Sequence, residues 1–173
     1  PVQVLRHGSQ RLHRQKCAQQ VIHRVIRLGF QIVIQFCGGL AVCDPENGIT
    51  RRIHDITNAQ FRSKFDDDID KFAGNSGIGI ISDYEDQPLI ISSRFGNYAI
   101  VTVGKINNIE ELAEDAFNRG FSHFSESSCG ELNPTEIVAM LIGRKPTIVE
   151  GIEYAQKVID GSCSILILID NKI

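Results

Sequence analysis

The chain has 173 residues, of which 42% are hydrophobic and 23% are charged, and its formal net charge is −3. This length suits one domain with a single core, and no apolar run is long enough to span a bilayer. The five cysteines are odd in number and lack paired metal-ligand spacing. They favour a reducing compartment, so we expect a cytoplasmic protein.

The charge is divided unevenly along the chain. Residues 1–43 contain six Arg or Lys and no Asp or Glu, and the twelve basic and twenty-one acidic residues of 44–173 give that part a charge of −9. A basic arm of this kind can contact nucleic acid. It lacks aromatic interleaving, zinc spacing and a convincing recognition helix, so we expect no nucleic-acid partner and keep this contact as a third alternative.

Residues 1–36 are rich in Gln, His and Arg and are the hardest part to assign. Apolar periodicity predicts a helix over 15–28 and a strand over 30–36. From Cys37 the sequence resembles that of an ordinary globular domain. It predicts strands over 39–43 and 49–53, joined by a tight turn over 44–48.

Residues 64–72 predict a helix with Phe65, Ile69 and Phe72 on its apolar face. The run 66–68 consists of three Asp residues, which we expect in the first helical turn, exposed to solvent and complementing the helix dipole. A calcium loop would need a Gly and a distal Glu that the run lacks, so a metal site is the less favoured alternative.

Three apolar runs predict strands over 78–82, 89–93 and 98–103. We expect them to form one sheet. Because the runs are almost continuously apolar, both faces of that sheet should be covered.

Three helices are predicted by a capping residue placed three positions before a Glu, where the cap satisfies a free N–H and the Glu reaches back. Each predicted helix ends at a glycine. The pairs and ends are Asn108 with Glu111 and Gly120, Asn133 with Glu136 and Gly143, and Thr147 with Glu150 and Gly161. An apolar strand over 162–169 follows, which completes a layered α+β pattern.

Six segments together carry a resemblance over residues 37–173: GGLAV, GNSGIGI, Gln87-Pro88 before a strand, GNYAIVTVGKINNIEEL, NPTEIVAMLI and VIDGSCSILILIDNKI. In order and spacing they resemble the glutaminase half of the amidophosphoribosyltransferase family, which are class II glutamine amidotransferases. The resemblance implies a four-layer αββα sandwich of the N-terminal-nucleophile hydrolase type, here incomplete. An unrelated mixed α/β domain is the alternative.

In that family an N-terminal Cys attacks the glutamine amide, with its own α-amino group as the base. An Asn side chain and a Gly N–H stabilise the oxyanion, while an Arg and an Asp hold the substrate. Ammonia then passes to a phosphoribosyltransferase domain, for which 173 residues leave no room. We therefore expect no cofactor in this chain, since the Mg of the family belongs to that absent domain.

Carried over by position, the resemblance implies four substrate-pocket candidates: Gly104, Lys105, Thr135 and Glu136. The oxyanion Asn corresponds to Val103, which has no donor, and the amine-binding Asp corresponds to Pro134. The substrate-binding Arg and the N-terminal Cys have no counterpart. We therefore assign no catalytic residue and no metal ligand.

Neither Cys37 nor Cys43 can supply a free α-amine, so we expect both to be buried small hydrophobes instead of substitute nucleophiles. Gly77 and Gly79 are followed by a strand, so we expect them to permit close packing and not to bind a dinucleotide.

We hypothesise that residues 1–36 come from a shifted reading frame, because codon choices exist for 11–14 and 25–28 whose next frame resembles the family. Such a segment would be poorly ordered. The expected division is thus an atypical basic segment over 1–36 and a glutamine amidotransferase-like domain over 37–173.

The first functional hypothesis is a partial amidophosphoribosyltransferase-like domain of purine nucleotide biosynthesis without glutaminase activity. The alternative is a non-catalytic glutaminase-like module that binds a ligand or regulates a partner. If ligand binding is retained, the expected ligand is glutamine. We expect no association with a membrane, and a homo-oligomer stays possible.

Overall fold

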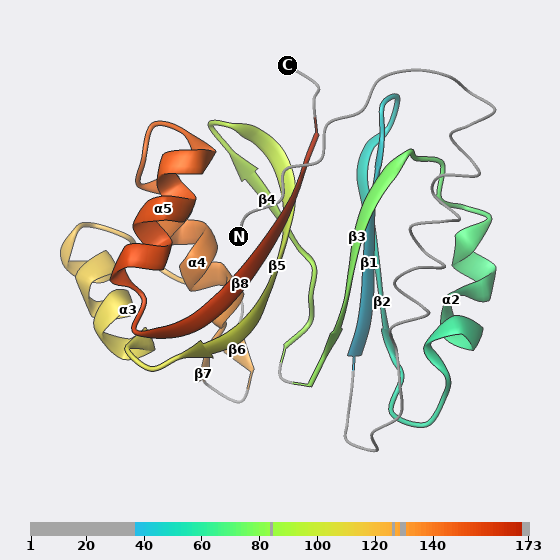
Figure 1. Ribbon diagram of the computed structural model, residues 1–173, viewed down its shortest axis with the longest axis horizontal. Coiled ribbons are helices and arrows are strands. Elements are labelled where there is room, and N and C mark those ends of the chain that lie inside the picture. The colour runs from blue at the N-terminus through green and yellow to red at the C-terminus, as the bar shows by residue number, and fades with distance from the viewer. Residues whose placement is uncertain (1–36, 84, 126, 129–130, 171–173) are drawn as a thin grey trace. The chain divides into compact units, whose positions relative to one another are not determined.

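The computed structural model describes residues 37–83, 85–125, 127–128 and 131–170 (Figure 1). The predictions for residues 1–36 therefore lie outside the described residues. The described chain forms two compact units. The first comprises residues 37–92, 96–101 and 166–170, and the second comprises 93–95 and 102–165. No described helix is both long and apolar enough to cross a bilayer.

The first unit is built around an antiparallel sheet with the strand order β2-β1-β3. Its strands are β1 (Cys37–Asp44), β2 (Gly48–Asp55) and β3 (Ser76–Ser82). The predicted hairpin between β1 and β2 is confirmed: both carboxylate oxygens of Asp44 accept hydrogen bonds of 2.8 Å, from the Glu46 N–H and the Asn47 side chain. Gly48 has a φ of 81°, a conformation that a residue with a Cβ rarely adopts.

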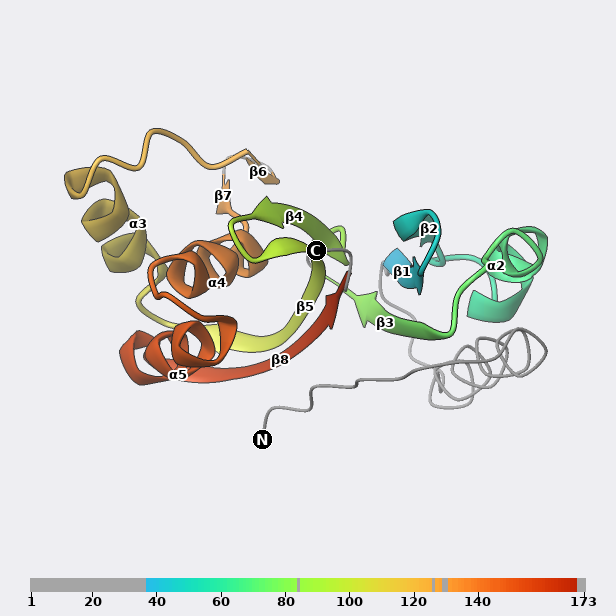
Figure 2. The ribbon, with the colours of Figure 1, turned by 90° about the horizontal axis from the view of Figure 1, so that it is seen from above.

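Helix α2 (Phe61–Ile69) packs on this sheet (Figure 2). Its rings join two side chains of β1 in one core cluster. The buried members of that cluster are Leu40, Val42, Phe61, Phe65 and Phe72. A Cβ on Gly38 would lie 2.7 Å from the Phe61 ring, so the glycine lets the helix approach the strand.

The prediction that the three Asp residues lie in the first helical turn is wrong, although Asp66 and Asp67 are exposed as expected. The helix begins at Phe61, one turn before the predicted start, because Phe61 and Phe65 share its buried face, with ring centroids 4.5 Å apart. Asp66 to Asp68 therefore lie beyond the first turn. Asp68 lies one turn after Phe65 on that face and is only 7% exposed.

A second sheet has the strand order β4-β5-β8. Its strands are β4 (Leu89–Ser93), β5 (Gly96–Ile106) and β8 (Gly161–Ile169). The prediction that three successive strands form one sheet is wrong, because β3 pairs with β1 and the second neighbour of β5 is β8. Apolar content indicates that a strand is buried, but it does not specify the strand's neighbours.

Burial of the central strand confirms that both of its faces are covered: Tyr98, Ala99, Ile100 and Val101 are each at most 2% exposed. The edge strand differs, since Ile90 of β4 is 39% exposed. Within the first unit, Ala41 and Cys43 of β1 pack with Ala99 and Leu168. Gly77 also fits its predicted packing role, because a Cβ there would lie 2.9 Å from the Ala41 carbonyl oxygen.

The second unit contains three helices, α3 (Ile109–Asn118), α4 (Pro134–Gly143) and α5 (Ile148–Val158), gathered on one side in Figure 2. A short antiparallel ladder of β6 (Ser127–Ser128) and β7 (Glu131–Leu132) precedes α4 and was not predicted. Helices α4 and α5 pack closely, since a Cβ on Gly151 would lie 2.4 Å from the Ile142 carbonyl oxygen.

Two of the three predicted helix caps are present. The Asn133 side chain accepts from the N–H groups of Thr135 (2.9 Å) and Glu136 (3.2 Å), and Thr147 accepts from the Glu150 N–H at 3.2 Å. The prediction for Asn108 is wrong. Its side chain instead donates to the Val158 carbonyl at 3.0 Å and accepts from the N–H of Asp160 at 2.9 Å.

Candidate functional site

Gly104 and Lys105 lie near the end of β5, where β8 approaches closely. Gly104 has a φ of 150°, and a Cβ at this position would lie 1.9 Å from the Ser162 carbonyl oxygen. A Cβ on Gly161 would likewise lie 2.1 Å from the Lys105 carbonyl oxygen. The close approach of the two strands thus requires glycine at both positions, independently of the substrate-pocket role predicted for Gly104. The Lys105 side chain is exposed.

Val103, at the position where the resemblance calls for an oxyanion Asn, is 61% exposed. Its neighbour Thr102 is buried, so the covered part of β5 ends between these two residues. An isopropyl group donates no hydrogen bond, so this side chain cannot stabilise a developing negative charge.

Thr135 lies in the first turn of α4 and is fully buried. Its hydroxyl oxygen lies 2.5 Å from that of Thr102 in β5, so the two hydroxyls share a hydrogen bond. Thr135 is therefore hydrogen-bonded to the strand that carries Gly104, at a residue two positions before that glycine. The capping bond from Asn133 fixes the same turn.

Glu136 is used differently from the predicted capping box. Its carboxylate accepts from the Ser125 N–H at 2.8 and 3.1 Å and from the Ser125 hydroxyl at 2.7 Å. These contacts attach the segment after α3 to the start of α4. The carboxylate is thereby committed to a structural contact, while its expected substrate-binding role stays a prediction.

The Cys37 thiol lies in surroundings that favour its protonated form, although the residue is half-buried and not fully buried as expected. The pKa of Cys37 is raised to about 11. Burial is the largest cause, and a hydrogen bond with Asp86 and the negative charges of Asp86 and Asp55 act in the same direction. Cys43 is 7% exposed and packs in the core, with its sulfur 3.9 Å from Asp170 Oδ1. A thiol that stays protonated at neutral pH is a poor nucleophile.

A histidine–carboxylate pair in the first unit was not predicted. His54 Nε2 of β2 lies 2.6 Å from Asp68 Oδ2 of α2. Two cations lie near the other carboxylate oxygen: Arg52 Nε and Lys71 Nζ are 3.5 and 3.6 Å from Asp68 Oδ1. The hydrogen bond from His54 is the largest cause that lowers the pKa of Asp68. The Phe65 ring packs edge-on against His54. Fourteen residues separate the pair, so no local pattern could have shown it, and its position between β2 and α2 indicates a structural role.

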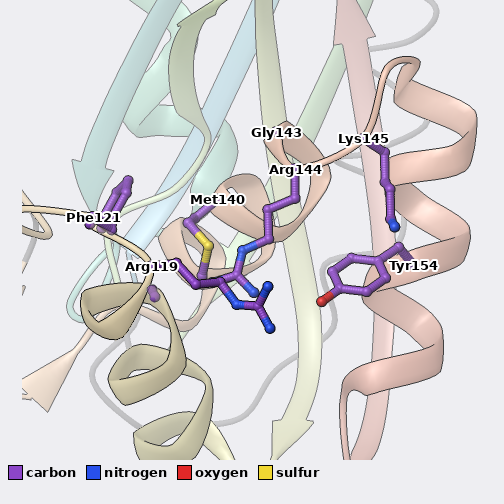
Figure 3. A pocket seen from close by; sticks show the side chains of 9 residues that line it. Arg119, Phe121, Met140, Gly143, Arg144, Lys145 and Tyr154 are labelled. Carbon is purple, nitrogen blue, oxygen red and sulfur yellow. The ribbon is translucent and has the colours of Figure 1, made fainter.

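A pocket with a volume of about 570 Å³ lies among the three helices of the second unit (Figure 3). Its lining residues come from the ends of α3 and α4 and from the middle of α5. They are Ala116, Arg119, Gly120, Phe121, Met140, Gly143, Arg144, Lys145 and Tyr154. None of the four predicted candidates is among them. Arg119, Arg144 and Lys145, which directly follow α3 and α4 in an otherwise acidic region, were the sequence signal that could have indicated this pocket.

Within the described ranges, no group of three or more His, Cys, Asp or Glu side chains is placed to hold a metal ion. The alternative that residues 66–68 bind a metal ion therefore gains no support, since Asp68 pairs with the cationic side chains of Arg52 and Lys71.

Comparison with known proteins supports a relationship in fold. No protein family profile matches the chain, and no curated protein matches it. Among solved structures, it is similar to glutamine phosphoribosylpyrophosphate (PRPP) amidotransferase from B. subtilis complexed with ADP and GMP, with a TM-score of 0.66 and 21% sequence identity. The similarity covers 90% of this chain and 33% of the other. The described residues thus have the mixed α/β fold of part of that protein.

Proposed function

We propose that this chain is a glutamine amidotransferase-like domain, related by descent to the amidophosphoribosyltransferases of purine nucleotide biosynthesis, that does not hydrolyse glutamine. The observation that carries the proposal is the structural similarity over 90% of the chain to a PRPP amidotransferase. On this proposal the complete arrangement is the αββα sandwich of N-terminal-nucleophile hydrolases, and the packing of β1 on β5 and β8 in the first unit supports its two inner layers.

The loss of activity rests on the chemistry of three positions. Val103 offers no donor to an oxyanion, and removal of one such donor costs on the order of a hundred- to a thousand-fold in rate. Pro134 offers no carboxylate to a substrate amine. The pKa of Cys37, raised to about 11, keeps that thiol protonated at neutral pH.

A second candidate function is binding without catalysis. At the start of α4 the hydroxyl and the N–H of Thr135 are both hydrogen-bonded, and the exposed Lys105 supplies a positive charge on β5. A cation of this kind can attract the α-carboxylate of an amino acid. This candidate predicts that glutamine binds and is released unchanged.

An assay of glutamate release by the purified chain tests the proposal. We expect no release above the rate without protein, and measurable release by the purified chain would contradict the proposal. Calorimetric titration with glutamine then tests the second candidate. Lys105→Gln should weaken any binding, whereas the matched Lys64→Gln in α2 should not, and equal affinities would exclude a role for Lys105.

A further inference from the structure

The pocket among α3, α4 and α5 carries more positive charge than its surroundings neutralise. Arg119, Arg144 and Lys145 line it, and Figure 3 shows their side chains reaching the pocket from the ends of α3 and α4. Asp115 pairs with two of them: its carboxylate lies 2.8 Å from Arg119 Nε and 2.6 Å from Arg144 Nη1. One carboxylate against three cations leaves an excess of two positive charges.

Several donors of these cations remain available to a ligand. Arg119 uses only Nε on Asp115, and Arg144 uses only Nη1. In the part of the chain that the structure describes, no residue accepts from the other guanidinium nitrogens of either side chain. Arg144 is also held firmly, since its side chain is only 19% exposed. A fixed guanidinium with unused donors is suited to the oxygens of an anion.

The C-terminal end of α4 also faces this region, and a helix C-terminus would by itself repel an anion. Arg94 offsets that effect. Its Nη2 donates to the carbonyl of Gly143 at 2.9 Å and also to the carbonyl of Lys145. The last carbonyl of α4 and the Lys145 carbonyl beyond it are therefore paired with a further cation, which opposes the partial negative charge of this helix end.

The remaining wall is apolar and aromatic. Lys145 Nζ lies 4.4 Å from the centroid of the Tyr154 ring, and Phe121 and Met140 complete the lining. A volume of about 570 Å³ is larger than an inorganic anion needs and lies within the range of pockets for organic ligands. Aromatic walls commonly bind planar apolar groups.

We propose that this pocket binds a phosphate monoester attached to a planar aromatic group. A phosphate monoester carries a charge close to −2 at neutral pH, which matches the excess of two positive charges, and offers several acceptor oxygens to the two guanidinium groups. The site is distinct from the candidates at the start of α4, because Arg144 lies nine positions after Thr135 along the helix, a rise of about 14 Å.

Titration of the whole chain with phenyl phosphate, at constant ionic strength, tests the proposal. Calorimetry or the shifts of backbone amides of 116–154 in an NMR spectrum report binding. We expect saturable binding by phenyl phosphate, weaker binding by inorganic phosphate because it lacks the ring, and weaker binding by benzoate because it carries one charge. No saturable binding, or benzoate binding as tightly as phenyl phosphate, would overturn the proposal.

Variants locate the site and distinguish it from general attraction of anions. Arg119→Gln and Lys145→Gln should each lower the affinity by roughly tenfold, the effect of one charge-assisted contact. Lys157→Gln is the matched control, because it removes a charge from α5 outside the pocket. Asp115→Asn should raise the affinity severalfold, since it removes the carboxylate that competes with the ligand. Equal affinities in all four variants would refute the site, whether or not the chain hydrolyses glutamine.

Discussion

The two ends of α4 use polar side chains in opposite ways. At its start, Thr135, Asn133 and Glu136 are turned toward protein groups and satisfy them. At its end, Arg144 and Lys145 line a pocket, and apart from the bond of Arg144 Nη1 to Asp115 no described residue accepts from the Arg144 guanidinium. The comparison teaches that positions singled out by a sequence resemblance need not be the ones whose polar groups are available to a ligand. In this chain the residues that carry the resemblance stabilise the helix, while residues outside the family pattern are better placed to meet a ligand.

The largest effect should come from a change at the contact between α5 and the last turn of α4. Gly151→Ala in α5 gains helix propensity, but its Cβ would lie 2.4 Å from the Ile142 carbonyl oxygen, so we expect a net loss of about 2–3 kcal/mol in the free energy of unfolding. Urea denaturation measures it. Gly143→Ala is the control, because a Cβ there meets nothing within 4 Å, and it should be neutral or stabilising. Equal losses in both variants would contradict the close approach of α4 and α5.

The next effect concerns only the start of α4. Thr135→Val keeps the shape of the side chain and removes the 2.5 Å hydrogen bond to the buried Thr102 hydroxyl. We expect a loss of about 1–2 kcal/mol in the free energy of unfolding. A double-mutant cycle with Thr102→Val should show a smaller loss than the sum of the single changes. Strict additivity would mean that the two hydroxyls do not interact, while phosphate binding at the other end of α4 should be unchanged.

A smaller effect should follow from removal of the helix cap. Asn133→Ala removes the acceptor for the N–H groups of Thr135 and Glu136, which should lower the free energy of unfolding by about 1 kcal/mol. Asn133→Asp keeps an acceptor and should retain most of the stability. Thermal denaturation of both variants checks this, and an alanine variant as stable as the parent chain would show that the cap contributes nothing.

The smallest effect is a pH dependence at the pocket end. Hydrogen bonds from Arg119 and then Arg144 hold the pKa of Asp115 below its ordinary value. A lowered folded-state pKa contributes stability above the unfolded pKa of about 4, and this contribution is lost as the pH falls through the folded value. Asp115→Asn should therefore have a shallower loss of stability below about pH 4 than the parent chain. Identical pH profiles from urea denaturation would show that the ion pairs carry no stability.

Much of the secondary structure follows from local patterns. Strand β4 spans the predicted residues 89–93, and β1, β2, β5 and β8 each contain the strand predicted for them. The caps at Asn133 and Thr147 form as expected because a capping side chain and the N–H groups that donate to it lie within four residues of one another. The same local reasoning fails at Asn108, whose side chain finds partners fifty residues away.

The candidate site was less predictable than the fold. Position in the resembling segments singled out Gly104, Lys105, Thr135 and Glu136, and the structure joins Thr135 to β5 through Thr102. No pattern indicated that Glu136 would contact Ser125, because that contact depends on the path of the segment after α3. The pocket lining was also missed, since its residues come from three helices whose packing no short window contains.

The sequence by itself determined most of the described strands and helices and how two of the helices begin, since each depends on residue identity or near neighbours. Only the tertiary structure decided that β3 pairs with β1 instead of β4, that Asp68 is buried beside His54, and that three cations meet at one pocket. The physical reason is that strand pairing, burial and the convergence of charges depend on contacts between residues far apart in the chain.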